Sequence, residues 1–199
     1  MRPYLGAALL WLACAALPGA AQEFPALYSV AGVAADDVLN IRSAPSASAE
    51  IIGTLAPDQA GVEVVAADGS GKWGLVNSGE RSGWAALRYL TRAAAEDGLA
   101  LPRRFSCFGT EPFWILNITQ EDAAVYASHG GHTRLDAGRV LTSRNLGGHY
   151  LLPLEGGTAA VIRRSACSDG MSGRSFGLSV DLLQLDAPAL QSGCCSLAP

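Results

Sequence analysis

DVLNIRSAPS, the sequence of residues 37–46, decides the fold expected for the first half of the chain. Leu39 and Ile41 alternate with Asn40 and Arg42, which is the pattern of a strand with one buried face. The segment SAPS then favours a turn, because serine and proline are frequent at turn positions. The stretch therefore predicts a short strand of an all-β domain.

Four further strand-like segments follow this one. They are residues 51–55, 62–65, 72–76 and 82–85, and the sequence DGSG at 68–71 predicts a turn between two of them. Five short strands within about 65 residues favour a small barrel over an open sheet.

These motifs, in this order, resemble the bacterial SH3-like (SH3b) domain over residues 26–91. Besides residues 37–46, the resemblance includes IGTL at 52–55, VEVV at 62–65, Trp73, SGW at 82–84 and the pair Tyr89-Leu90. It implies an SH3-like barrel and a domain that often targets envelope proteins and enzymes to cell-wall peptidoglycan, while other members bind peptides. Exposed aromatic side chains of such barrels form shallow grooves for extended peptides or glycan stems. The resemblance therefore suggests three ligand-binding residues: Tyr28, Trp73 and Tyr89.

The N-terminus has the pattern of an export signal. Arg2 precedes an apolar run from Leu5 to Leu17, and the small residues Gly19, Ala20 and Ala21 follow Pro18. We therefore expect residues 1–21 to be a signal peptide, cleaved between Ala21 and Gln22, and the protein to be periplasmic or secreted. The run is too short to span a bilayer comfortably, so no transmembrane helix is expected after cleavage.

A lipoprotein is the alternative reading of this segment. Lipidation would modify Cys14, but the preceding Trp11-Leu12-Ala13 is a poor match to the required leucine and small residues. We therefore prefer cleavage at Ala21.

Cleavage changes the composition of the chain. It removes one basic residue and no acidic one, which moves the net charge from -4 to -5, and it removes one of five cysteines. The four remaining cysteines all lie at position 107 or beyond, so we expect a first domain at residues 22–92, a linker at 93–103 and a disulfide-stapled β domain at 104–199. An acidic chain without a basic run argues against nucleic acid as a partner.

The second half contains three distinctive motifs: FSCFGTEPFW at 105–114, CSDGMS at 167–172 and GCC at 193–195. They resemble a group of bacterial envelope and lipoprotein-like proteins of unknown function over about residues 104–196. We expect the motif residues to be structural, with Pro112, Phe113, Trp114 and Met171 packing in the domain. The full structural set is Gly109, Glu111, Pro112, Phe113, Trp114, Asp169, Met171 and Ser172.

The four cysteines allow three pairings. A bridge between the adjacent Cys194 and Cys195 would need a strained ring, so two pairings remain. We prefer Cys167–Cys194 with Cys107–Cys195, because the first bridge closes a local loop around the strand predicted near residues 175–182.

Two sets of side chains could carry chemistry. Glu111 and Asp169 could act as a carboxylate pair in an enzyme that modifies the cell wall, but we prefer that they accept backbone hydrogen bonds at turns. His129, His132 and His149 could bind zinc, but the sequence HGGH at 129–132 is more typical of a polar hairpin tip. We therefore predict no metal and no cofactor.

The resulting hypothesis is a non-enzymatic binding protein whose partner is peptidoglycan or an envelope protein. An enzyme delivered to the wall by the SH3b domain, or an inhibitor of a lysozyme-like enzyme, are the alternatives.

Overall fold

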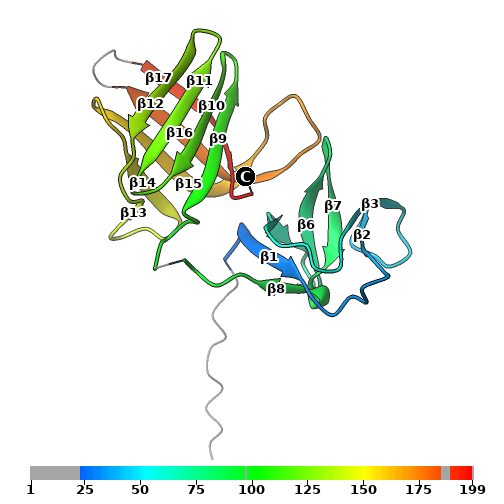
Figure 1. Ribbon diagram of the computed structural model, residues 1–199. Coiled ribbons are helices and arrows are strands. Elements are labelled where there is room, and N and C mark those ends of the chain that lie inside the picture. Colours follow the sequence, from blue (N-terminus) through cyan, green and yellow to red (C-terminus); the bar gives the residue numbers. More distant parts are fainter. Residues whose placement is uncertain (1–22, 97, 185–188, 199) are drawn as a thin grey trace, which may run out of the picture.

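The computed structural model describes residues 23–96, 98–184 and 189–198. The chain forms two β domains that lie side by side, the first blue to green and the second green to red (Figure 1). The predicted all-β fold is therefore confirmed. The predicted signal peptide, with Cys14, lies outside the described residues. Within them, no helix is long and apolar enough to cross a membrane.

The first domain contains two antiparallel sheets, with strand orders β4-β1-β8 and β3-β2-β7-β6-β5. Its elements are β1 (Ala26–Val30), β2 (Leu39–Arg42), β3 (Ile51–Leu55), β4 (Val62–Val64), β5 (Ala66–Ala67), β6 (Trp73–Ser78), β7 (Arg81–Ala86), the 3-10 helix η1 (Leu87–Tyr89) and β8 (Leu90–Arg92).

Side-chain alternation sets the buried face of these sheets. Leu39 and Ile41 of β2 are buried, as predicted, and so is Val76 of β6. Trp73 and Leu75 lie on the opposite, half-buried face of β6. The sequence patterns predict all strands of the larger sheet except the two-residue β5. They do not predict β1 and β8, which come from the two ends of the domain and pair with each other.

The second domain is one antiparallel sheet with the order β12-β11-β10-β9-β17-β16-β15-β14-β13. Its strands are β9 (Arg104–Thr110), β10 (Phe113–Thr119), β11 (Ala123–Ser128), β12 (Gly131–Asp136), β13 (Leu141–Thr142), β14 (His149–Pro153), β15 (Thr158–Cys167), β16 (Phe176–Gln184) and β17 (Ala189–Ser196).

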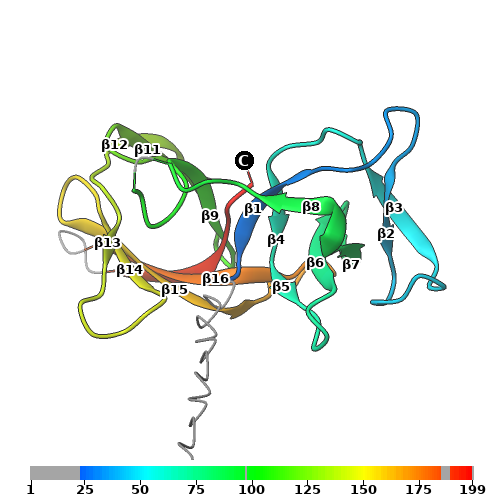
Figure 2. The same cartoon turned by 90° about the horizontal axis from the view of Figure 1, so that it is seen from below.

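This sheet curls until the segment after β12 meets the end of β14. The Gly138 N–H donates to the Pro153 carbonyl at 3.0 Å, and the Glu155 N–H donates to the Asp136 carbonyl at 3.0 Å. The curled sheet encloses the larger hydrophobic core of the molecule (Figures 1 and 2).

The strands around this core alternate as predicted. On β10 the buried residues are Trp114, Leu116 and Ile118, and on β16 they include Phe176, Leu178, Val180 and Leu182. Apolar side chains at alternate positions therefore set which face of each strand is inward.

Gln120 is a buried polar side chain that no pattern in the sequence predicts. Its Nε2 donates to the carbonyls of Leu101 at 2.9 Å and Pro102 at 2.8 Å, and its Oε1 accepts from the Val140 N–H at 2.8 Å. Because these bonds satisfy the amide, its burial is tolerated. Gln120 thus joins the segment before β9 to the loop after β12.

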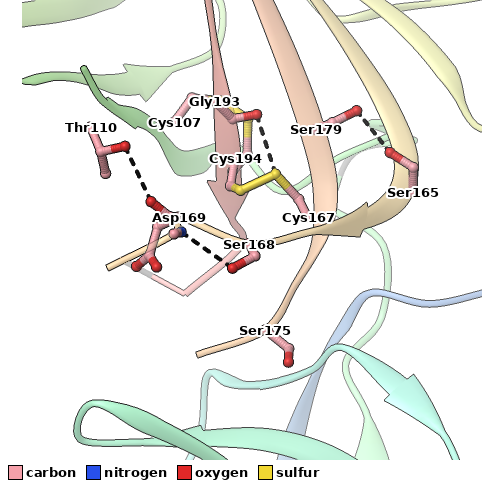
Figure 3. Close-up of a disulfide and its surroundings, with 12 residues drawn as sticks. Cys107, Thr110, Ser165, Cys167, Ser168, Asp169, Ser175, Ser179, Gly193 and Cys194 are labelled. Carbon is pink, nitrogen blue, oxygen red and sulfur yellow. Dashed lines mark hydrogen bonds between the residues drawn. A yellow bond between two sulfur atoms is a disulfide. The ribbon is translucent and has the colours of Figure 1, made fainter. Parts of the chain in front are cut away.

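Two disulfides cross-link the second domain. Cys194 and Cys195 are adjacent on β17, so their side chains point to opposite faces of the strand. Cys195 bonds to Cys107, its cross-strand partner on β9. Cys194 bonds to Cys167 at the end of β15, and Figure 3 shows this second bridge. This is the preferred one of the two pairings that the sequence left open.

One set of contacts between the domains, here called the loop clamp, joins the β15–β16 loop to the β6–β7 hairpin. The Gly173 N–H donates to the Glu80 carbonyl at 2.8 Å, and the Ser82 N–H donates to the Gly173 carbonyl at 3.1 Å. The Asn77 side chain adds two bonds, because its Nδ2 donates to the Ser175 carbonyl at 2.9 Å and its Oδ1 accepts from the Ser175 N–H at 3.2 Å.

A second set of contacts lies on the outer face of the β4-β1-β8 sheet. Leu27 packs against the core of the second domain, and beside it Glu63 is only 7% exposed and accepts a hydrogen bond from the Ser196 hydroxyl. Nearby, Arg164 Nη1 donates to the Pro25 carbonyl at 2.8 Å. Burial raises the pKa of Glu63, and the hydrogen bond from Ser196 offsets only part of this effect.

The two disulfides should differ in what they contribute to stability. A bridge restricts the unfolded chain more when it closes a longer loop, and the sequence separations are 27 and 88 residues. Replacing Cys167 and Cys194 together with alanine should lower the free energy of unfolding by about 3.5 kcal/mol, and replacing Cys107 and Cys195 by about 4.6 kcal/mol. Urea denaturation followed by tryptophan fluorescence measures both. A larger loss at Cys167–Cys194 would contradict this order.

The stability of the protein should depend on the ionisation of Glu63. Its pKa is raised in the folded state, so its favourable contribution is fully present below the ordinary glutamate pKa and is lost as the pH rises through the raised value. Glu63→Gln, which cannot ionise, should remove this loss, so that the variant gains stability relative to the native chain with increasing pH. Thermal unfolding across acid to neutral pH tests this, with Glu50→Gln at an exposed position of the same domain as the control. Parallel pH profiles for the native chain and Glu63→Gln would refute it.

Candidate functional site

A shallow groove of about 260 Å³ lies on the first domain, between the β1–β2 loop and η1. Its aromatic and charged lining residues are Trp73, Tyr89, Asp37, Arg42 and Arg88, and its small lining residues include Ala47. The groove therefore combines aromatic surface with charged groups.

The turn before β6 positions Trp73. Asp68 Oδ1 accepts from the N–H groups of Lys72 and Trp73, both at 2.9 Å, while Oδ2 accepts from the Ser70 hydroxyl at 2.6 Å. Gly71 has a φ of +67°, a conformation that favours glycine. The hydrogen bonds, that from the Ser70 hydroxyl foremost, lower the pKa of Asp68 to about 2. The carboxylate therefore stays ionised, and the turn stays bonded, well into the acid range.

Tyr89 forms the other aromatic wall of the groove, at the end of η1. The Arg88 guanidinium lies over its ring, 4.7 Å from the centroid. Arg42 is held in place because its Nη1 donates to the Ala49 carbonyl at 2.7 Å. Aromatic rings beside guanidinium groups can stack on a ligand and pair with its carboxylates, and Asp37 adds an acceptor.

The structure corrects one of the three predicted ligand-binding residues. Trp73 and Tyr89 line the same groove, but Tyr28 is only 1% exposed and belongs to the core of the first domain. β1 lies between β4 and β8, and the alternation along it directs Tyr28 inward. Tyr28 therefore cannot contact a ligand in the groove.

Arg42 and Arg88 were not identified as groove residues from the sequence. Arg42 does alternate with buried residues on β2, which indicates an outward side chain. Arg88 lies in η1, where no pattern in the sequence marks the outward face. Their place in the groove depends on how η1 packs beside the β1–β2 loop, and the sequence does not show this packing.

The structure brings two motifs of the second domain together. The Thr110 hydroxyl donates to the Asp169 carbonyl at 3.1 Å (Figure 3). The Asp169 carboxylate accepts from the N–H groups of Met171 at 3.0 Å and Ser172 at 2.9 Å, and from the Ser172 hydroxyl at 2.8 Å. Partial desolvation opposes ionisation, but these bonds together lower the pKa of Asp169. The carboxylate thus stabilises its own turn, while Glu111 is exposed between β9 and β10.

The packing expected for these motifs is present only in part. Trp114 is buried, stacks on Tyr126 with ring centroids 6.2 Å apart, and approaches Gly109 so closely that a Cβ there would collide with the indole nitrogen. The prediction that Phe113 and Met171 pack in the domain is wrong, because they are 46% and 77% exposed. Both follow turns that direct them towards solvent. Pro112, in the turn before Phe113, is likewise exposed.

Two of the three histidines lie on the β11–β12 hairpin, and the third lies on β14 of the same domain. His129 is at the tip of the β11–β12 hairpin, where its ring stacks on Phe113, and His132 follows on β12. The Nδ1 of His149 is 3.1 Å from the Gly147 carbonyl. In the part of the chain that the structure describes, no cluster of three or more histidine, cysteine or acidic side chains could hold a metal ion.

Comparison with known families identifies the first domain. Residues 37–91 match the family model described as bacterial SH3 domain. The matched residues include β2 to β7, η1 and every aromatic and charged residue named in the groove. Comparisons with curated proteins and with solved structures gave no match. Within the first domain, residues 37–91 are therefore assigned to the bacterial SH3 domain family.

Proposed function

We propose that this protein is an exported, non-enzymatic binding protein of the bacterial cell envelope, and that the groove around Trp73 and Tyr89 holds peptidoglycan or a peptide of an envelope protein. The observation that carries the proposal is that this groove lies within a bacterial SH3 domain. Such domains often bind the cell wall. The two disulfides also support a location outside the cytoplasm, because structural disulfides persist in oxidising compartments.

The bonding of Asp169 supports a binding role over a hydrolytic one. A general acid must hold a proton near neutral pH, whereas the hydrogen bonds to Asp169 favour its ionised form. Glu111 lies on an exposed turn, where water would screen any partner charge. We therefore assign the Asp169 carboxylate to the structure of its turn.

The chain without residues 1–21 should co-sediment with purified peptidoglycan. Trp73→Ala and Tyr89→Ala should each weaken binding at least tenfold, or about 1.4 kcal/mol, because each removes an aromatic wall of the groove. Titration of the bound fraction against peptidoglycan concentration gives the affinities.

Two exposed alanines of one loop provide a test that leaves the core intact. Ala47 lines the groove, whereas Ala44 does not. Ala47→Arg should therefore weaken co-sedimentation and Ala44→Arg should not. If the folded native chain stays in the supernatant, peptidoglycan is not the ligand. If Ala47→Arg and Ala44→Arg bind as well as the native chain, the ligand lies elsewhere.

A further inference from the structure

A larger cleft, of about 620 Å³, lies between the two domains and is separate from the SH3 groove. One wall comes from residues 65–67 and Leu75 of the first domain, and the other from residues 164–168 of the second. Phe24 and residues 175–177 complete the lining. Figure 2 shows β5 beside the adjoining ends of β15 and β16, and Figure 3 shows Ser165, Cys167 and Ser168 above the first domain.

Both walls of this cleft are open strand edges. β5 is the last strand of its sheet. β14 pairs with β15 only as far as Arg163, so residues 165–167 have no neighbouring strand on that side in the described structure. A register shift between Arg164 and Cys167 also places Ser165 and Ala166 in a bulge. An open edge presents unpaired backbone groups and can accept a further strand.

The side chains of the cleft favour a neutral, apolar occupant. Val65, Leu75, Phe24 and Phe176 supply apolar surface. Arg164 is the one lining residue among those described that carries a charge, and its guanidinium is already bonded, with Nε 2.7 Å from Tyr150 Oη and Nη1 bonded to Pro25. The cleft therefore offers little to a carboxylate-rich ligand.

The cleft is also preformed. The loop clamp closes one side through Asn77 and Ser175, and the Arg164–Pro25 bond ties the chain at β1 to the wall formed by β15. The Cys167–Cys194 disulfide fixes the end of that wall. The residues of the cleft are therefore already held in place before a ligand binds, which reduces the entropic cost of association.

We propose that this cleft binds an extended segment of a partner protein, which adds as a strand to the open edges of β5 and residues 165–167. Its apolar side chains would contact Val65, Leu75 and Phe176 at alternate positions. A protein segment fits better than a peptidoglycan stem peptide, which is rich in carboxylates and mixes residue chirality, so that its side chains do not alternate as in a regular strand. The site is independent of the SH3 groove and does not rest on the function proposed for it.

The test is selection of a displayed random heptapeptide library on the chain without residues 1–21. Ala166→Arg should block the cleft from its exposed bulge, and Ala35→Arg, on an exposed loop outside the cleft, is the matched control. Selected peptides should show apolar residues at alternate positions and bind Ala166→Arg at least tenfold more weakly than Ala35→Arg. Methylation of alternate peptide nitrogens should also weaken binding, because it removes strand hydrogen bonds.

Further measurements separate this site from the SH3 groove. Ala166→Arg should leave peptidoglycan co-sedimentation unchanged, and Trp73→Ala should leave peptide binding unchanged. If Ala166→Arg is unstable, Ala67→Arg blocks the opposite wall. The proposal is overturned if no selected peptide binds the native chain more tightly than it binds both Ala166→Arg and Ala67→Arg. It is also overturned if soluble peptidoglycan fragments displace the selected peptides.

Discussion

The pairing of β17 with β9 is the contact on which the second domain depends. Strands β9 to β12 form one array of consecutive hairpins and β13 to β17 form another. The pairing of β17 with β9, in which Cys195 lies opposite Cys107, joins them into a single sheet. Both residues are fully buried in the core, and their disulfide locks the register at that point. A slip of one residue would turn every side chain of β17 to the wrong face, so the bridge also fixes which side of the strand is inward.

The disulfide of the neighbouring Cys194 constrains the chain close to the contact between the two domains. This bridge to Cys167 fixes the end of β15, where the loop that forms the clamp begins. Asn77 then bonds to the backbone of Ser175 on both its donor and its acceptor side. The relative placement of the SH3 domain thus follows from a strand at the far end of the chain, which explains how two domains joined by one short segment keep a defined cleft between them.

The sequence was sufficient wherever a residue's environment follows from its own strand. Leu39, Ile41 and the apolar residues of β10 and β16 alternate clearly, and their burial is as expected. It was insufficient where burial depends on distant segments. Tyr28 is buried because β4 and β8, both distant from it in the sequence, flank β1, and Met171 is exposed because a turn projects it away from the core. The groove was predicted through its two rings, whereas Arg88 joins them only through the folded position of η1.

The adjacency of Cys194 and Cys195 has a consequence for how the chain acquires its bridges. Synthesis delivers Cys107 and Cys167 before either of their native partners, so within this domain they first have only each other to react with. A bridge between them must be exchanged before the native pairs can form, and thiol–disulfide exchange of this kind proceeds through mixed disulfides. Both native pairs can therefore form only after β17 has been made, and any earlier bridge between Cys107 and Cys167 must first be exchanged.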